Sequence, residues 1–327
     1  MVLIPSSRFR WVYCQLETLR HCLVRNVQRT LGELPQTLDD TYERILREIP
    51  SQNAGDTHRL LQCLTVAVRP LRVEELAEVL AVDVITGRTP MLNVDSRWED
   101  QKQAILLACS SLVVVVDDDG SRFVQFSHFS VKEFLTSDRF AASKGDVSRY
   151  IIWPEPAHIV MAQACLAVLL RLDYHIDKES VKNFPLADYA ASHVGDHVGF
   201  GNVISRVRDA VDCLIDVEKP HFHAWLWVRG KIPTWMWPQI PKSQDRSDIV
   251  PLYHVVQLGC YGMVQHVILK RPQDVNASLD PYGTSLHPAL HNERRGLTAT
   301  IWTLCRRDTS GPQRPHSTAY GVEEGIP

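Results

Sequence analysis

The chain has 327 residues, of which 45% are hydrophobic and 22% charged, and its formal net charge is −3. This length allows about two or three domains with cores of their own. The weakly acidic balance argues against a dedicated nucleic-acid binder, which would carry a basic footprint. Its longest apolar runs fall far short of the roughly 18 residues of a membrane span, and the N-terminus lacks the apolar stretch of a secretory signal.

The cysteines also bear on the cellular compartment. All 8 are scattered, and none forms a Cys-x-x-Cys pair. Five lie in or beside predicted apolar helical positions, which favours buried thiols over disulfides: Cys63, Cys109, Cys165, Cys213 and Cys260. We therefore expect a cytoplasmic protein that is neither membrane-bound nor bound to nucleic acid.

Residues 1–56 are predicted to form a helical segment. Apolar side chains recur at helical spacing over residues 9–23, namely at Phe9, Val12, Tyr13, Leu16, Leu19 and Leu23. A second helix follows Pro35, with Thr37 as its N-cap and Asp40 at the third helical position. Its predicted inward stripe is Leu38, Tyr42, Ile45, Leu46 and Ile49.

Residues 57–140 are predicted to begin with three helices. The first carries Leu60, Leu61, Leu64 and Val68 and is stopped by Pro70. The second spans Val73–Ala81, with Leu76 and Leu80 inside. After a loop over Asp83–Asp95, the third spans Arg97–Cys109, with Trp98, Ile105 and Cys109 on one face.

A β-hairpin and a capped helix are predicted next. Leu112–Val116 and the run around Phe123 to Phe126 read as strands, and Asp117–Gly120 supplies the turn residues. Ser130 is expected to N-cap the following helix, with Glu133 at capping-box spacing and with Phe134 and Leu135 facing inward. A hairpin between helices, after three earlier helices, is the layout of a winged helix.

The predicted third helix does not favour DNA reading. A DNA-binding winged helix needs a basic helix to meet phosphates and base edges. This segment has Glu99 and Asp100 against Arg97 and Lys102, and much of the rest is apolar. We therefore interpret the winged helix as a packing module.

The remaining chain divides into four predicted segments. Residues 141–230 form a helical domain, with an apolar stripe at Met161, Ala164, Cys165, Val168, Leu169 and Leu172, a short helix over Phe184–Val194, and another with Val207, Val211, Leu214 and Ile215. Residues 231–249 are a Pro/Trp-rich linker. Residues 250–292 hold one repeat and part of a second, since PLYH and TSLH place Leu252 and Leu286 near the ankyrin period. Residues 293–327 are an irregular or disordered tail.

Three of these runs resemble one protein family. FxHxSxxEFL around His128, LPxxLxxxYxxIL from Leu34 and PLAxYAAxH from Pro185 are similar to signatures of fungal NACHT–ankyrin proteins of the STAND, NLR-like class. The resemblance covers roughly residues 9–292. It implies the middle of a signal-transduction switch for intracellular non-self recognition, between a NACHT domain and an ankyrin array.

His128 is the one candidate site residue. The resemblance implies that this histidine contacts a phosphate of bound ADP in complete family members. An imidazole N–H can donate to a phosphate oxygen. The alternative is a histidine satisfied inside the strand-to-helix junction. No GxxxxGK[ST] occurs, and Gly230-Lys231 is followed by Ile232. We therefore expect no ligand at His128 in this chain, no bound cofactor and no catalytic residue.

Two other readings are weaker. His193 and His197 have i, i+4 spacing near His221 and His223, but neither HExxH nor CxxC supports a metal, so packed histidines are favoured. Trp225, Trp227, Trp235 and Trp237 could form an interaction surface, but a packed inter-domain seam that covers the end of the first ankyrin repeat is favoured.

The predicted fold is mainly α: a winged-helix domain with a β-hairpin wing, an α-helical linker domain and an incomplete ankyrin repeat. The predicted function is a non-catalytic protein-interaction and regulatory module of a NACHT–ankyrin protein, with a protein partner such as a NACHT domain. One alternative is a part of a STAND NTPase switch whose P-loop lies outside this chain. The other is a DNA-binding winged-helix protein. The sequence leaves the oligomeric state open.

Overall fold

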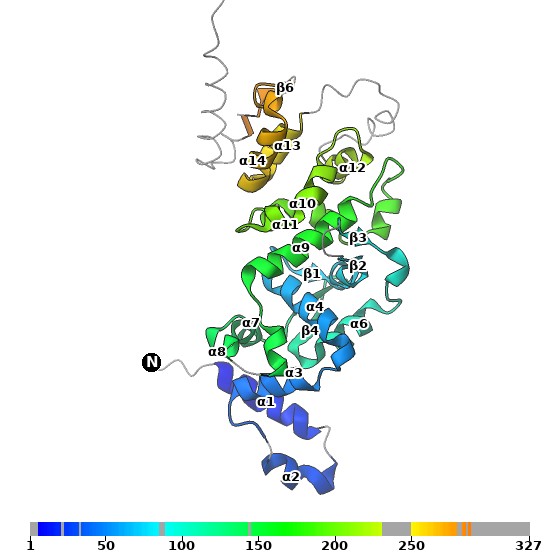
Figure 1. Cartoon of the computed structure of the whole chain (residues 1–327). Coiled ribbons are helices and arrows are strands. Elements are labelled where there is room, and N and C mark those ends of the chain that lie inside the picture. Colours follow the sequence, from blue (N-terminus) through cyan, green and yellow to red (C-terminus); the bar gives the residue numbers. More distant parts are fainter. Residues whose placement is uncertain are drawn as a thin grey trace, which may run out of the picture. The chain divides into compact units, whose positions relative to one another are not determined.

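The computed structural model of the chain describes residues 6–20, 23–32, 34–84, 89–142, 145–230, 250–279, 283–285 and 287–288. They are mainly helical, with short antiparallel sheets (Figure 1). The chain forms two compact units, residues 1–246 and residues 247–327. The predicted linker at 231–249 and the predicted tail at 293–327 lie outside the described residues. The predicted boundaries at 140 and 230 stay predictions.

The N-terminal helices place an apolar stripe in solvent. Helix α1 spans Ser6–Arg20, and η1 (Val24–Asn26) and α2 (Val27–Gly32) follow it. Of the apolar residues predicted at helical spacing over residues 9–23, four are exposed: Val12 at 44%, Tyr13 at 54%, Leu16 at 60% and Leu23 at 61%. The helix turns Cys14 and Gln15 inward instead, and Gln15 Nε2 donates to Thr41 Oγ1 at 3.0 Å.

Helix α3 spans Leu38–Glu48 and lies beside α1 (Figure 1). Thr37 is its N-cap, as predicted, and Thr37 Oγ1 accepts the N–H of Asp40 at 3.1 Å. The predicted stripe is confirmed at Tyr42, Ile45 and Leu46, and Ile49 is buried directly after the helix.

The winged helix is present, with three short strands, β1, β2 and β3, that the sequence pattern did not indicate. After η2 (Ser51–Asn53), the elements run α4 (Ala54–Val66), β1 (Leu71–Arg72), α5 (Val73–Glu78), η3 (Val79–Ala81), β2 (Val82–Asp83), β3 (Met91–Leu92), η4 (Val94–Ser96), α6 (Gln101–Cys109), η5 (Ser110–Leu112), β4 (Val113–Asp118) and β5 (Ser121–Phe126). Strand β1 pairs with β5, which gives the sheet order β1-β5-β4. Its two residues are too few to show any sequence period.

Three details of the predicted helices are corrected. Helix α6 begins at Gln101 rather than Arg97, because the Asp100 carboxylate accepts the N–H of Gln103 and caps the helix there. Trp98 therefore lies outside the helix and is 56% exposed. Helix α5 tightens to a 3-10 turn at η3, which buries Val79 and leaves Leu80 half-buried. Val68 lies beyond α4 and is 51% exposed.

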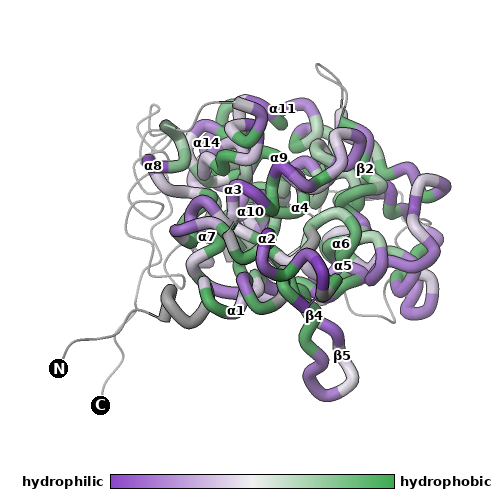
Figure 2. The backbone as a smooth tube through the Cα atoms, turned by 90° about the horizontal axis from the view of Figure 1, so that it is seen from below, coloured by the Kyte–Doolittle hydropathy of each residue, from purple (hydrophilic) through white to green (hydrophobic). Residues whose placement is uncertain are grey.

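The predicted hairpin is confirmed with a tighter turn. Strand pairing continues to Asp118 and Ser121, so only Asp119 and Gly120 connect the strands. Both have positive φ, 49° and 79°, as the tightest hairpin turns require. In Figure 2 the hairpin of β4 and β5 projects from the neighbouring helices.

A helical layer follows the winged helix within the first unit. After α7 (Phe129–Leu135), α8 (Asp138–Ala141) and η6 (Asp146–Tyr150), it contains α9 (Pro154–Leu169), η7 (Ser180–Asn183), α10 (Ala187–Val198), α11 (Val203–Leu214) and α12 (Pro220–Val228). Helix α9 lies against α4, α10 and α11. The predicted stripe from Met161 to Leu169 is confirmed on α9, and Leu172 lies just beyond the helix; every member is at most 1% exposed. The helix predicted to begin at Phe184 begins at Ala187. No described helix combines the length and apolar character that crossing a bilayer requires.

The second unit contains a helix pair and a short hairpin. Helices α13 (Pro251–Leu258) and α14 (Tyr261–Lys270) pack on each other across Gly259, whose φ of 69° is left-handed. Then follow η9 (Pro272–Val275) and the paired strands β6 (Ser278–Leu279) and β7 (Gly283–Thr284). The predicted helix pair around a glycine is confirmed, while its assignment as an ankyrin repeat stays a prediction. Leu286 and residues 289–292 lie outside the described part.

Candidate functional site

His128 stands between the last strand of the winged-helix sheet and helix α7. Its backbone is extended, with φ −161° and ψ 149°, and its Nδ1 accepts the N–H of Ser130 at 3.2 Å. His128 is therefore the N-cap of α7. The prediction of Ser130 as cap, with Glu133 completing a capping box, is wrong because Ser130 lies inside the helix and is 8% exposed.

Ser130 joins His128 to helix α3. Ser130 Oγ lies 2.6 Å from His128 Nδ1 and 2.8 Å from Tyr42 Oη. Since Nδ1 accepts from the Ser130 backbone, it carries no proton, so the serine hydroxyl donates to it and the tyrosine hydroxyl donates to the serine. The proton of the neutral imidazole is then on Nε2.

Aromatic side chains surround this junction. Tyr42 is 1% exposed, and its ring packs on Phe134, with centroids 5.3 Å apart. His128 itself is half-buried, and its ring lies 4.2 Å from that of Phe129, which is 55% exposed. An imidazole N–H is a donor that an anionic oxygen can accept. One donor does not make a nucleotide site, which also needs a phosphate cradle.

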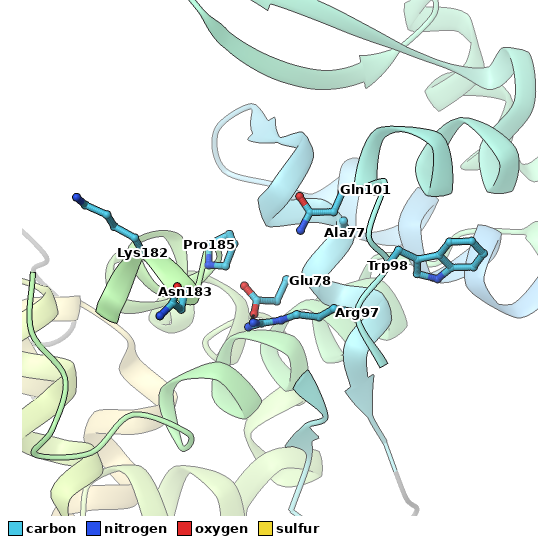
Figure 3. A pocket seen from close by; sticks show the side chains of 8 residues that line it. All are labelled: Ala77, Glu78, Arg97, Trp98, Gln101, Lys182, Asn183 and Pro185. Carbon is cyan, nitrogen blue, oxygen red and sulfur yellow. Dashed lines mark hydrogen bonds and ion pairs between the residues drawn. The ribbon is translucent and has the colours of Figure 1, made fainter. Parts of the chain in front are cut away.

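A second candidate site is a cleft of about 220 Å³ between α5, the start of α6 and the segment before α10. Figure 3 shows Glu78 and Arg97 directed toward each other, while Trp98 and Lys182 point away from that pair. Arg97 Nη2 is paired with the Glu78 carboxylate, whose other oxygen accepts the N–H of Leu186 at 3.0 Å.

The charged side chains of Glu78 and Arg97 make contacts that hold segments of the fold together. Burial raises the pKa of Glu78, while its bonds to Leu186 and Arg97 oppose that rise. The Arg97 guanidinium also lies over the ring of Phe184, 5.6 Å from its centroid. We interpret the pair as a clamp that fastens α5 and the segment before α6 to the segment before α10.

The histidines considered above as possible metal ligands make separate contacts. His197 is 0% exposed, and its Nδ1 lies 3.0 Å from Nδ1 of His158, which sequence reasoning missed. His193 Nδ1 lies instead 3.0 Å from the Asp196 carboxylate. Across the described residues, no group of three His, Cys, Asp or Glu side chains could hold a metal ion.

A chain of hydrogen bonds passes through His197. The N–H of Val68 donates to Tyr189 Oη at 3.1 Å, and the same hydroxyl lies 2.9 Å from His197 Nε2. His197 Nδ1 in turn lies within hydrogen-bond distance of His158 Nδ1. Burial, together with nearby His158 and His193, lowers the pKa of His197 to about 3. The chain therefore consists of neutral groups and links the segment after α4 to α9 and α10.

The two described members of the predicted tryptophan cluster, Trp225 and Trp227, pack inside. Trp225 is 0% exposed, and its Nε1 donates to the carbonyl of Ala191 at 3.0 Å. Trp227 is 9% exposed. These two side chains are packed, as favoured, while their place at an inter-domain seam stays a prediction, and Trp235 and Trp237 lie outside the described residues.

Comparison with known proteins identifies the winged helix and one distant relative. Residues 42–146 match the winged helix domain of GPI inositol-deacylase. The azaphilone pigments biosynthesis cluster protein L of Monascus ruber is 29% identical over 293 residues, which are 84% of this chain and 61% of that protein. No solved structure matches the chain. The winged helix is thereby supported independently of the family resemblance in the sequence.

Proposed function

We propose that this chain is a non-catalytic protein-interaction and regulatory module of the NACHT–ankyrin type. The observation that carries the proposal is the outer face of α1. Val12, Tyr13 and Leu16 lie one helical turn or less apart and are all at least 44% exposed. An amphipathic helix normally buries its apolar stripe, and an exposed one favours docking against another protein surface.

The winged helix supports a packing role over DNA reading. The DNA-reading helix of such a fold presents basic side chains to the major groove. Helix α6 instead exposes Leu106 and Leu107, at 36% and 56%, beside Lys102 and Gln103. A protein partner suits this surface better than a polyanion.

The second unit supports the ankyrin part of the proposal. Helix α13, the left-handed Gly259, helix α14 and the β6–β7 hairpin follow one another in the order of an ankyrin unit. Stable arrays need about three such repeats, so this unit would require further repeats or another partner.

The partner that we propose for α1 is a NACHT nucleotide-binding domain, on the family resemblance of the sequence. The Monascus relative is named only as a protein of a pigment biosynthesis cluster. That name specifies no reaction, and a regulatory interaction role is compatible with it.

The test is a calorimetric titration of the full chain with a separately produced fungal NACHT domain. We expect Leu16→Glu to abolish the binding heat and Val68→Glu to preserve it, since Val68 is similarly exposed but lies away from α1. Equal binding by the two variants would exclude the α1 stripe as the docking surface.

A second candidate function is part of an ADP-held switch whose P-loop lies on another segment. The place of His128 supports it, because the resemblance assigns the phosphate contact to this histidine and Ser130 fixes its ring through Nδ1. A phosphate oxygen could accept a hydrogen bond from an imidazole N–H. Retention of ADP by an assembled NACHT domain and this chain, with and without His128, tests this candidate.

A further inference from the structure

Strand β4 forms one edge of the winged-helix sheet. The sheet order is β1-β5-β4, so among the described strands β4 pairs with β5 alone. Its first four residues, Val113–Val116, are all valine, a residue with high β propensity. An edge strand presents unpaired backbone N–H and C=O groups that can bind an added strand.

The outer face of the hairpin is apolar beside this edge. The register sets Val114 opposite Gln125 and Val116 opposite Phe123, so these four share one face. Val114 and Val116 are 37% and 38% exposed, and Phe123 is half-buried. An added strand could therefore gain side-chain contacts as well as backbone hydrogen bonds.

The tip of the same hairpin is acidic. Asp117, Asp118 and Asp119 are consecutive and exposed, and Figure 2 shows the hydrophilic tip projecting beyond the neighbouring helices. Arg122 lies opposite Asp117 in the register, but its guanidinium donates to Glu74 at 2.9 Å. The tip therefore offers negative charge to an approaching segment.

We propose that the β4 edge binds an extended, basic segment of a partner protein by β-strand addition. Apolar side chains of that segment would lie on Val114 and Val116, and its Lys or Arg side chains would meet Asp117–Asp119. Backbone hydrogen bonds and contacts with the valines would supply the affinity, and the charges would select a basic partner. The surface is separate from the α1 stripe, so the inference does not rest on the proposed function.

Charge favours this occupant over a second copy of the chain. A second copy brings the same three carboxylates. Antiparallel pairing of two β4 strands about Val115 would also set Asp118 of one copy beside Leu112 of the other, which is 1% exposed. A basic segment meets neither obstacle.

The test uses a fluorescein-labelled decapeptide of alternating Lys and Val, added to the full chain and followed by fluorescence anisotropy. The comparison peptide carries the same lysines with Gly or Ser in place of Val, so it has equal charge and low β propensity. We expect the first peptide to bind at least about tenfold more tightly, with new amide-exchange protection in residues 113–118. Equal binding of both peptides would mean that charge attraction alone accounts for the binding, and it would overturn the proposal.

Matched variants locate the effect on the chain. Val114→Lys with Val116→Lys should weaken binding at least about tenfold, because both positions are exposed and the change sets like charges opposite each other. Asp118→Asn should weaken it less, and Leu269→Lys and Glu99→Gln, at other exposed sites, should leave it unchanged. Unchanged binding by the double valine variant would contradict the proposal. So would concentration-dependent dimerisation in sedimentation that the same variant removes, since the edge would then bind a second copy.

Discussion

Tyr42 Oη lies 2.8 Å from Ser130 Oγ, and this bond joins helix α3 to helix α7 across 88 residues of sequence. Ser130 in turn contacts Nδ1 of His128, so a buried tyrosine helps to fix the one candidate site residue. The motif around His128 and the helix from Leu38 therefore act as one structural unit.

Tyr42→Phe should lower the free energy of unfolding by about 1 kcal/mol, and by up to about 3 kcal/mol if Ser130 is left without its donor. Urea unfolding measures the change. Tyr261→Phe is the control, because that hydroxyl makes an exposed contact and its loss should change stability by less than about 0.5 kcal/mol. Equal effects of the two changes would show that the Tyr42 bond contributes nothing specific.

His128→Ala should lower stability by about 1 kcal/mol through loss of the N-cap of α7. His128→Asn should restore most of this loss, since asparagine is a good N-cap. In an assembly with a NACHT domain, however, Asn should not restore ADP retention, because it lacks a donor at the Nε2 position. Full retention of ADP by either variant would contradict the switch candidate.

Stability should fall as pH falls from 7 to 5, in part through His197. Its pKa is near 3 in the fold, against an ordinary value of 6.5, so the unfolded state binds more protons between these values. Its contribution is fully present above pH 6.5 and is lost as pH approaches 3. Over pH 7 to 5 this amounts to about 2 kcal/mol.

His197→Asn should remove that part of the pH dependence, whatever its effect at pH 7. His175→Asn, at an exposed position, should keep the slope of the wild type. Urea unfolding at both pH values gives the comparison. If the His197 variant keeps the full slope, His197 is not the buried neutral group that the hydrogen bonds imply.

The stabilisation that Glu78 provides should depend more on the oxygen that accepts the Leu186 N–H than on the negative charge of the side chain. Glu78→Ala leaves the Leu186 N–H and Arg97 without their partner and should cost about 3 kcal/mol. Glu78→Gln retains an acceptor for Leu186 and should cost about 1 kcal/mol. Glu74→Gln, at a half-exposed pair, should cost less than about 1 kcal/mol. A Gln variant as unstable as the Ala variant would assign the clamp to the charge pair instead.

The sequence was most informative where the signal is local. The valine run, the aspartates and Gly120 indicate a hairpin within ten positions, and Thr37 with Asp40 marks a helix start. Each depends on neighbours along the chain, so tertiary packing did not alter it.

The predictions that failed concern residues whose structure depends on side chains far away in the sequence. Ser130 suits an N-cap, but Tyr42, far away in sequence, holds it inside the helix. Helical periodicity groups Val12, Tyr13 and Leu16 on one face, but it does not say whether another layer covers that face. His158 carries no motif, and only the packing of α9 on α10 brings it to His197.

The central claim is that the exposed stripe of α1 binds a protein partner, and amide hydrogen exchange tests that claim most directly. The full chain is compared alone and with an excess of a fungal NACHT domain. We predict slower exchange in residues 11–20 on addition of that domain, with no change in α9, and no slowing in the Leu16→Glu variant. Exchange in residues 11–20 that stays unchanged, or that slows equally in the variant, would contradict the assignment of this surface to a protein partner.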